Sequence, residues 1–362
     1  MNILILNVGS SSIKYSIFSN EKLLLKGSIN DIHKKSEYSI GIHAIMTVVK
    51  KNNLKIDAVG HRIVHGGTTR QSKIISPSII NLIKKYSEFA PVHNIPELIG
   101  IHESKKLFKV PHIAVFDTAF HSVIPPRAFL YGIPYKYYSK HGIRRYGFHG
   151  ISYKYASEKS SEILKKPLVK LKLIIAHLGH GCSVDAIDKG VSVDTSMGLT
   201  PLEGIMMTNR SGDVDAGLIL HLMAKEKFSL EQMNNMLNKK SGLQGLSGIS
   251  DNMRVLLKSK NRKARIAIDV FTYRIAKYIG AYVAVLKGVD AIVFTGGIGE
   301  NSAVIREKIL SYFDFMGLKL DSNMNKKNSP IISKKDSKIK AVVVPADEEL
   351  MIAREVLRLF RN

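Results

Sequence analysis

Two segments of the chain share one pattern, a buried apolar run that ends abruptly in a loop of glycine and small polar residues. The first run, residues 3–6, leads into residues 7–12, and the second, residues 173–176, leads into residues 177–183. Apolar runs of this length that are bounded by glycine are typical of buried strands. Glycine lets backbone N–H groups approach an anion closely, as phosphate-binding turns require. The repeated pattern therefore predicts a duplicated fold with two loops that face one nucleotide.

The elements around the two loops are predicted to repeat in the same order of strand, loop, strand, turn and strand. The expected strands cover residues 2–8, 13–18 and 21–29 in the first half, and 184–187 and 190–194 after the central apolar run. Internal duplication of this kind is stronger evidence of architecture than any single motif. A chain of 362 residues is also too long for one ordinary core. We therefore expect an α/β fold with two domains.

The rest of the chain shows the periodicities of helices and buried strands. Ile268, Phe271, Ile275 and Ile279 recur at steps of three and four residues, which predicts a long amphipathic helix over 264–287. Further helices are expected at 40–50, 79–86, 153–164 and at the C-terminal end through Phe360, and further strands at 57–67, 110–116, 291–294 and 342–345. The intervening segments are expected to be a proline-framed loop at 89–96, a glycine-rich loop at 296–301, and an exposed loop or β excursion at 326–340.

The formal net charge of +24 would by itself suit a protein that binds nucleic acid. The lysines are scattered along the chain, however, without interleaved aromatic residues or a nucleic-acid motif. We therefore prefer a lysine-rich solvated surface, whose positive field would also favour anionic substrates. The single cysteine, Cys182, excludes an internal disulfide framework and fits a reducing compartment. No signal peptide or membrane span is visible, so a cytoplasmic protein that binds neither nucleic acid nor membrane is expected.

Several charged residues stand where strands end in glycine-rich turns. Arg62 lies between two histidines, His61 and His65, shortly before a Gly-Gly turn, which favours anion binding over a surface ion pair. Asp117 ends a predicted strand, where α/β proteins place ligands, although helix capping is an equally common role. Residues 144–150 pack two arginines, two aromatics and a histidine into one short segment. No Walker A lysine loop occurs, so a P-loop enzyme is excluded.

The chain resembles the acetate kinase (acetokinase) family, within the actin-like superfamily that includes sugar kinases and the Hsp70 ATPase domain. The resemblance runs nearly end to end and rests on the motifs NVGSSSIK, GHRIVHGG, APVHN, VFDTAFH, RRYGFHG, DTSMGLTPLEG, RSGD, FTGGIGEN and EELMIA. It implies a duplicated actin-like (ribonuclease H-like) fold with the active site in an interdomain cleft, usually in a homodimer. The implied reaction is reversible, Mg-dependent transfer of the γ-phosphoryl group of ATP to acetate, which gives acetyl phosphate and ADP.

The resemblance also implies a set of site residues. The catalytic residues would be Arg62, Asp117, His149 and Arg210, with Arg62 also binding the substrate carboxylate. The methyl pocket for acetate would comprise Val64, Val92, Phe148 and Pro201. ATP or ADP would bind to Ser10, Ser12, Lys14, His177, Gly179, His180, Gly181, Asn252, Met253, Arg254, Gly297, Ile298 and Asn301. Asn7 and Glu348 match the region of the Mg²⁺ ion, where Mn²⁺ is an alternative.

The chain departs from the usual family pattern on the nucleotide side. His180 stands where asparagine is usual, and Thr208-Asn209 stands where Gly-Thr is usual. Ala216 replaces a usual proline, and Asn252 replaces a usual aspartate. An imidazole in the second phosphate loop is bulkier than an amide and titrates near neutrality, so nucleotide affinity and its pH dependence are expected to differ.

The resemblance implies domain boundaries and leaves alternatives of function. We expect an N-terminal domain of residues 1–118 completed by 350–362, and a nucleotide-binding domain of residues 119–349. A propionate or butyrate kinase is the nearest alternative, because one methylene changes binding by only ~1–3 kcal/mol. A non-catalytic actin-like nucleotide-binding protein is the alternative from another class, and the intact Arg62, Asp117, His149 and Arg210 count against it.

Overall fold

The computed structural model describes residues 1–32 and 34–361, which divide into two compact units. Unit 1 comprises Met1–Ser122, Phe148–Tyr155 and Asp347–Asn362. Unit 2 comprises Val123–Gly147 and Ala156–Ala346. The chain therefore passes back and forth between the units, and each of them is built from segments that are distant in the sequence.

Unit 1 is built on a mixed sheet with the strand order β3-β2-β1-β4-β6-β5. The strands are β1 (Asn2–Val8), β2 (Ile13–Ser19), β3 (Lys22–Ile29), β4 (Ala58–Ile63), β5 (Lys73–Ile74) and β6 (His112–Phe116). The first three strands form an antiparallel meander, and β1, β4 and β6 are parallel neighbours. Parallel pairing brings the carboxyl ends of β4 and β6 to the same edge of the sheet.

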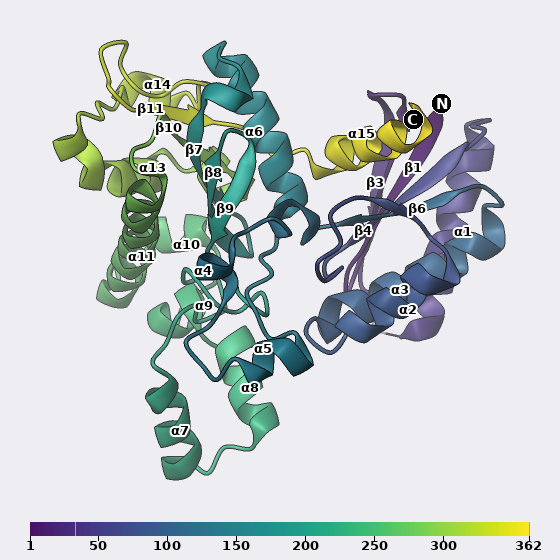
Figure 1. The fold of residues 1–362 in the computed structure, drawn as a ribbon, viewed down its shortest axis with the longest axis horizontal. Coiled ribbons are helices and arrows are strands. Elements are labelled where there is room, and N and C mark those ends of the chain that lie inside the picture. The colour runs from purple at the N-terminus through teal and green to yellow at the C-terminus, as the bar shows by residue number, and fades with distance from the viewer. Residues whose placement is uncertain (33, 362) are drawn as a thin grey trace. The chain divides into compact units, whose positions relative to one another are not determined.

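Helices cover both faces of this sheet, so the residues of β1 are buried on both sides (Figure 1). Leu4 and Leu6 belong to one core cluster with residues of α1 (Lys35–Lys51), whereas Ile3 and Ile5 belong to another with residues of α15 (Glu348–Arg361). The alternation follows from the two-residue period of a strand. The remaining helices of this unit are α2 (Pro77–Tyr86), α3 (Pro91–Leu107) and the short 3-10 helix η1 (Ala119–His121).

Unit 2 contains a second sheet with the strand order β11-β10-β7-β8-β9. Its strands are β7 (Lys172–Leu178), β8 (Cys182–Asp188), β9 (Val191–Thr195), β10 (Ala291–Thr295) and β11 (Lys340–Val343). An antiparallel meander leads to three parallel neighbours, β7, β10 and β11, as β1, β4 and β6 do in unit 1. The predicted duplication is confirmed.

The long predicted helix is α11 (Arg262–Leu286), which packs against β7 and β8 through a buried face that includes Phe271, Ile275 and Ile279 (Figure 1). The helix α6 (Gly150–Leu164) begins in unit 1 and continues into unit 2. The other helices of unit 2 are α4 (Pro126–Phe129), α5 (Lys136–His141), η2 (Leu168–Lys170), α7 (Ala216–Lys225), α8 (Leu230–Lys239), α9 (Gly242–Ser247), α10 (Met253–Lys258), α12 (Gly296–Asn301), α13 (Ala303–Leu310), η3 (Ser311–Met316) and α14 (Ser322–Lys326).

Three segments differ from the sequence-based expectation. The predicted proline-framed loop at 89–96 is wrong, because α3 begins at Pro91 and continues through Pro96. Proline is favourable in the first turn, where N–H groups lack partners in any case, and one interior proline costs one hydrogen bond. Residues 296–301 form a short helix, α12, instead of a loop. The segment 326–340 is a β excursion with a bridge between Ile331 and Val342, but it is not exposed throughout, since Ile332 is buried.

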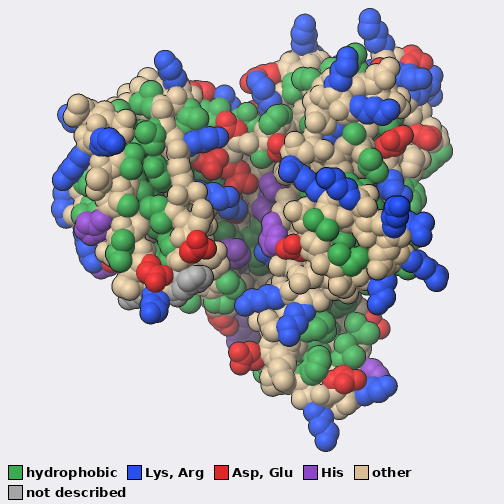
Figure 2. Space-filling view, turned by 180° about the vertical axis from the view of Figure 1, so that it is seen from behind, with side chains coloured by type: hydrophobic (Ala, Val, Ile, Leu, Met, Phe, Trp, Pro, Cys, Tyr) green, Lys and Arg blue, Asp and Glu red, His purple; other side chains and the backbone are tan. Residues whose placement is uncertain are grey.

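The distribution of charge on the surface agrees with the prediction that the lysines are scattered. On the face shown in Figure 2, Lys and Arg side chains are dispersed among uncharged atoms instead of forming one continuous patch. In the part of the chain that the structure describes, none of the helices combines the length and apolar character that a membrane span requires.

Gly60 in β4 tests the packing of α15 on the sheet. A Cβ atom at Gly60 would lie 2.9 Å from side-chain atoms of Ile5 and Ile352 and 3.0 Å from Val356. Because Val is a good strand former, Gly60→Val would destabilise only through this overpacking, by about 1–3 kcal/mol. Urea unfolding measures the loss. Gly132→Val is the matched control, since nothing lies within 4 Å of a Cβ there. Equal stability of both variants would contradict the described docking of α15.

Candidate active site

The loop between β1 and β2 is the first of the two predicted phosphate loops. Val8 pairs with Ile13, so residues 9–12 form a short hairpin loop, which the Gly9 N–H closes on the Ser12 carbonyl at 2.8 Å. Ser10 and Lys14 are exposed, and Ser12 is half-buried. Asn7 lies near the end of β1, on the α15 face by the alternation of the strand. The loop thus presents hydroxyl and ammonium side chains of the kind that a polyphosphate requires.

An ion pair joins the ends of two neighbouring strands in unit 1. Arg62 near the end of β4 donates from Nη2 to Asp117 Oδ2 at 2.7 Å, and Asp117 directly follows β6. Glu348, the first residue of α15, lies 3.6 Å from Arg62 Nε. Burial raises the pKa of Asp117, and the guanidinium of Arg62 counteracts this shift. Burial alone would lower the pKa of Arg62, but the carboxylates of Asp117 and Glu348 outweigh it and raise that pKa. Arg62 therefore stays cationic beside two acidic groups.

His149 occupies a backbone conformation that is rare for residues other than glycine. Its φ is +59°, in the left-handed region. The next residue, Gly150, donates its N–H to the Asp117 carbonyl at 3.1 Å and begins α6. A Cβ atom at Gly150 would lie only 2.1 Å from the same carbonyl oxygen, so glycine is required there. The strained backbone of His149 is thereby held next to the backbone of Asp117, the residue that pairs with Arg62, and such strain is typical of functional sites.

A buried polar layer supports the end of β4, and the sequence analysis did not single out its members. Both carboxyl oxygens of Glu97 lie 3.2 Å from the Val64 N–H, and Asn94 exchanges two hydrogen bonds with the backbone of His65. The Gly66 N–H donates to the Thr118 hydroxyl at 3.1 Å. Asn94 belongs to the APVHN motif and Glu97 follows it closely, so their place in the sequence could have indicated that both belong to this layer.

The histidines beside Arg62 have packing roles. His61 is buried, and its Nε2 lies 2.9 Å from Nδ1 of His112. His65 is fully buried and stacks on Tyr86 with ring centroids 4.9 Å apart. Residues next to each other on a strand face opposite sides, which places His61 away from Arg62.

The predicted methyl-pocket residues differ in exposure. Val64 and Phe148 are buried in unit 1. Val92 lies on the first turn of α3 and is 55% exposed. Pro201 is half-buried in unit 2. Val64 and Phe148, which are close in sequence to Arg62 and His149, therefore supply buried apolar side chains in unit 1.

The second predicted phosphate loop connects β7 and β8. Leu178 pairs with Cys182, and the Gly179 N–H donates to the Gly181 carbonyl at 3.1 Å, a closure like that of the first loop. His177, the penultimate residue of β7, is 7% exposed. Burial raises the pKa of the Cys182 thiol to about 12, so this residue is an inert part of the loop.

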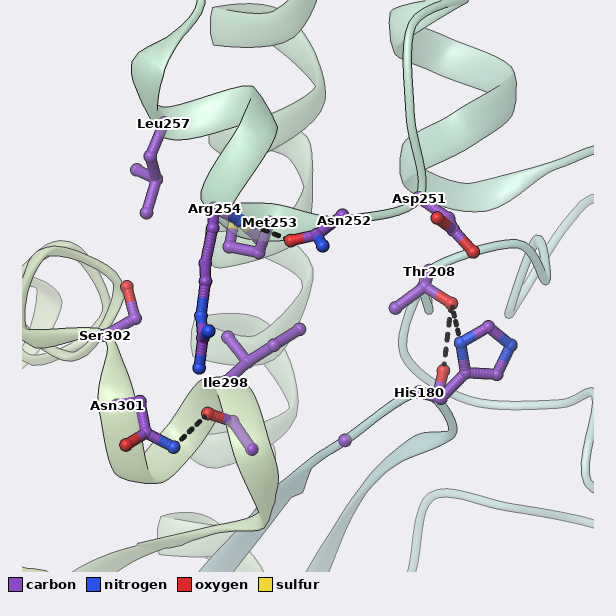
Figure 3. Close-up of a pocket in the computed structure, with 12 residues that line it drawn as sticks. His180, Thr208, Asp251, Asn252, Met253, Arg254, Leu257, Ile298, Asn301 and Ser302 are labelled. Atoms are coloured by element: carbon purple, nitrogen blue, oxygen red, sulfur yellow. Dashed lines mark hydrogen bonds between the residues drawn. The ribbon is translucent and has the colours of Figure 1, made fainter. Parts of the chain in front are cut away.

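A cavity of about 370 Å³ opens beside this loop (Figure 3). It is lined by predicted nucleotide residues from the loop, α10 and α12, together with further residues that were not among the predicted nucleotide residues. The predicted residues are Gly179, His180, Asn252, Met253, Arg254, Gly297, Ile298 and Asn301. The additional residues are Thr208, Asp251, Leu257 and Ser302. His177 and Gly181 do not line the cavity, although they belong to the same hairpin.

Local contacts hold the walls of this cavity in place. Asn252 caps α10 by accepting the Arg254 N–H at 2.9 Å, so the amide performs the capping function that an aspartate would also serve. Gly296 has a φ of +77°, and a Cβ there would lie 3.0 Å from the Gly179 nitrogen. The fully buried Arg306 donates to the carbonyls of Gly299 and Glu300 at 2.8 Å, which anchors α12.

Arg210 lies in the long segment that follows β9. Its Nη1 donates to the Pro201 carbonyl at 2.9 Å, and burial lowers its pKa. Gly242 approaches the same segment closely, since a Cβ there would lie 2.9 Å from the Arg210 carbonyl. The guanidinium is therefore positioned by backbone contacts within unit 2.

A polar clasp shapes the first part of that segment. Arg145 donates from Nη1 to the carbonyls of residues 195–197 at 2.9–3.2 Å, and its Nη2 lies 2.5 Å from Glu203 Oε1. The Tyr131 hydroxyl donates to the other Glu203 oxygen. Arg144 instead stacks on Phe129, 3.7 Å from the ring centroid. The residues of the charged motif at 144–150 thus have different roles: Arg145 forms the clasp, Arg144 packs on an aromatic ring, and His149 has a strained backbone.

Comparisons with known proteins agree with this architecture. A family model described as the Acetokinase family matches residues 33–354. An acetate kinase of Halothermothrix orenii is 47% identical over 398 residues, with 100% of each chain covered. The crystal structure of Porphyromonas gingivalis acetate kinase matches with a TM-score of 0.93 and 38% identity over 99% of each chain. A propionate kinase from Francisella tularensis matches with a TM-score of 0.91 and 36% identity over 98% of each chain.

Gly150 provides a test of the His149 conformation. Gly150→Ala would place a methyl group against the Asp117 carbonyl, so either Asp117 or His149 must move. A displacement of about 1 Å at a transfer centre costs roughly 10²-fold in rate, and we expect a loss of that size in kcat of phosphoryl transfer. Gly280→Ala on an exposed position of α11, where a Cβ meets nothing within 4 Å, should keep full activity. Full activity of Gly150→Ala would refute the constraint.

Glu97 predicts a pH dependence of stability. Burial raises its pKa to about 8, against an ordinary value of 4.5, so the folded protein retains a proton that the unfolded chain releases between these values. The contribution of Glu97 to the free energy of unfolding therefore falls as pH rises, by at most about 1.4 kcal/mol per pH unit. Urea unfolding of wild type and Glu97→Gln across this range should give a difference that shrinks with pH. A difference independent of pH would contradict the assignment.

Proposed function

The chain belongs to the acetokinase family and is a kinase, and from this premise we propose that it transfers the γ-phosphoryl group of ATP reversibly to acetate. The products would be acetyl phosphate and ADP. The single observation that carries the proposal is the Arg62–Asp117 pair, with His149 held beside it by Gly150. The named relatives favour acetate over propionate as the acceptor, since the similar curated protein and the first structural neighbour are acetate kinases.

Arg62 is proposed to hold the acceptor carboxylate. Its Nε and Nη2 atoms face Asp117, and Nη1 donates no hydrogen bond within the described residues. A guanidinium offers several donors in one plane, so it can bind Asp117 and a second carboxylate at the same time. The buried Val64 and Phe148 would exclude water beside the acetate methyl group. Because acetate is already ionised at neutral pH, the reaction requires no general base.

Arg210 and His149 are proposed to stabilise the transferring phosphoryl group. Negative charge spreads over its oxygens in the transition state, so positioned cations and N–H donors supply most of the catalysis. Arg210 is largely buried and its guanidinium is fixed by the Pro201 carbonyl. Fixed donors require little reorganisation during the reaction, which lowers the barrier to transfer.

The cavity beside the second loop is proposed to bind the nucleotide. Its loop offers backbone groups to phosphates, and Ile298 and Leu257 offer apolar contact to a base. Ser302 Oγ is buried and has no hydrogen-bond partner among the described residues, so it is available to a polar ligand atom.

The residues present fit a Mg²⁺ or Mn²⁺ ion that is held mainly by the nucleotide. Asn7, Asp117 and Glu348 supply hard oxygen donors, whereas no cluster of three His, Cys, Asp or Glu that would cage an ion occurs within residues 1–32 and 34–361. Mg²⁺ in kinases usually binds few protein oxygens and keeps phosphate and water ligands. When bound, the ion would neutralise phosphate charge. We further propose a homodimer, as the family resemblance implies, and a cytoplasmic location, which the free buried Cys182 supports.

Acyl hydroxamate formation tests the proposed activity. The protein incubated with ATP, Mg²⁺, acetate and hydroxylamine should accumulate acetohydroxamate. Removal of one charged donor from a transition state typically costs roughly 10²–10³-fold in kcat, and we expect a loss of this size for Arg210→Ala. Arg127→Ala, at an exposed position, is the matched control and should behave as wild type. Wild-type product at the level of Arg210→Ala would refute the proposal.

A further inference from the structure

His180 at the tip of the β7–β8 hairpin lies in a closed hydrogen-bonded cluster in the wall of the cavity (Figure 3). Its Nδ1 lies 3.0 Å from the Thr208 hydroxyl, and the same hydroxyl lies 3.2 Å from the His180 carbonyl oxygen. On the other side of the ring, Nε2 lies 3.2 Å from Nδ2 of Asn209. These three residues are among those that depart from the usual family pattern, and the structure brings them into contact.

One protonation state satisfies all three contacts. The Thr208 hydroxyl has a single proton, which it donates to the His180 carbonyl, so it accepts from Nδ1–H. Nε2 is then an unprotonated acceptor for the Asn209 amide. This assignment follows from the hydrogen-bond network, and it describes a neutral imidazole.

A second state is accessible through Asn209 alone. If Nε2 gains a proton, rotation of the Asn209 amide by half a turn presents its oxygen as the acceptor. The Thr208 contacts are unchanged by this rotation, because Nδ1 keeps its proton. The cluster is therefore satisfied with the ring either neutral or cationic, and Asn209 is the residue that permits both states.

The groups that face His180 decide which state the free protein adopts. Burial lowers the pKa of His180, Arg210 lowers it further, and Asp251 on the turn before α10 partly opposes both. Arg254 on α10 lines the same cavity, but its side chain extends toward Ile298 instead of His180 (Figure 3). The neighbouring residues that line the cavity from α12, which include Ile298 and Asn301, carry no ionisable group. Without a ligand, the balance thus favours the neutral ring at neutral pH.

We propose that nucleotide binding in this cavity is coupled to proton uptake by His180, and that Asn209 is the positioning residue that makes the uptake possible. The inference rests on the proposed function, because it requires the polyphosphate of ADP or ATP to lie near the second loop. Phosphate oxygens bring several negative charges to the exposed ring of His180, and opposite charge nearby favours the cationic form. The cationic ring would then offset part of the phosphate charge.

Isothermal titration calorimetry of Mg–ADP binding near pH 6.5 tests this coupling, with two buffers of different ionisation enthalpy to count the protons taken up. His180→Asn provides the baseline, because the phosphate of ADP itself titrates in this range. Wild type should take up a substantial fraction of one proton more than His180→Asn. Asn209→Leu, which cannot accept from Nε2–H, should lose most of that difference, and Asn209→Asp should lose it because a carboxylate protonates His180 before ADP binds.

The outcomes separate the inference from the function on which it rests. ADP binding by wild type with the same proton uptake as His180→Asn would overturn the coupling and leave the proposed function intact. Proton uptake that is unchanged in Asn209→Leu, in a variant whose thermal unfolding matches wild type, would overturn the role of Asn209. The absence of any ADP binding by folded wild type would overturn both the coupling and the proposed nucleotide site.

Discussion

The buried contact between Arg62 and Asp117 is the interaction on which the arrangement of unit 1 depends. Two parallel strands must end at the same edge of the sheet for these side chains to meet, so the register of β4 with β6 is part of the site. Removing Arg62 would leave the acidic groups of Asp117 and Glu348 without their cation, which is costly because Asp117 is buried. The pair is therefore a constraint on folding as well as a source of chemistry. The buried Glu97 and Asn94 extend the constraint to α3, because they satisfy the backbone just beyond Arg62.

The same carboxylate residue also fixes the start of α6. Gly150 bonds to the Asp117 carbonyl, and this contact holds His149 at a positive φ. The side chain of Asp117 thus orients a cation while its backbone orients a histidine. A strained backbone persists only where the surrounding structure over-determines it, and here the steric limit at Gly150 supplies that condition. The end of β6 consequently helps to position three side chains, those of Arg62, Asp117 and His149.

Much of the fold was predictable because its two halves repeat one pattern of apolar runs and loops. The matching orders β3-β2-β1-β4-β6 and β9-β8-β7-β10-β11 confirm the duplication that this pattern predicts. The errors have physical reasons. Pro91 and Pro96 suggested a loop, but α3 tolerates both because the first lies in its first turn and the second costs one hydrogen bond. Other roles were not predicted at all: His61 shares a motif with Arg62 but faces His112, and Arg144 packs on Phe129 while Arg145 forms the clasp. Such roles depend on which way a side chain points, which motif composition does not encode. The roles of the site residues themselves stay predictions.

The cavity of unit 2 illustrates a different limit of sequence reasoning. Residues 180, 208 and 209 lie on two segments that are far apart in the chain, and each departure from the family pattern, considered alone, suggests a weakened nucleotide site. In the structure they complete one another, since Thr208 satisfies both the ring and the carbonyl of His180 while Asn209 satisfies the other ring nitrogen. Three substitutions that form one satisfied network are better explained as a rebuilt loop than as independent losses. The Gly179 N–H still donates to the Gly181 carbonyl in this loop, so the departures affect the side chains of the predicted phosphate loop while its backbone is closed by a hydrogen bond.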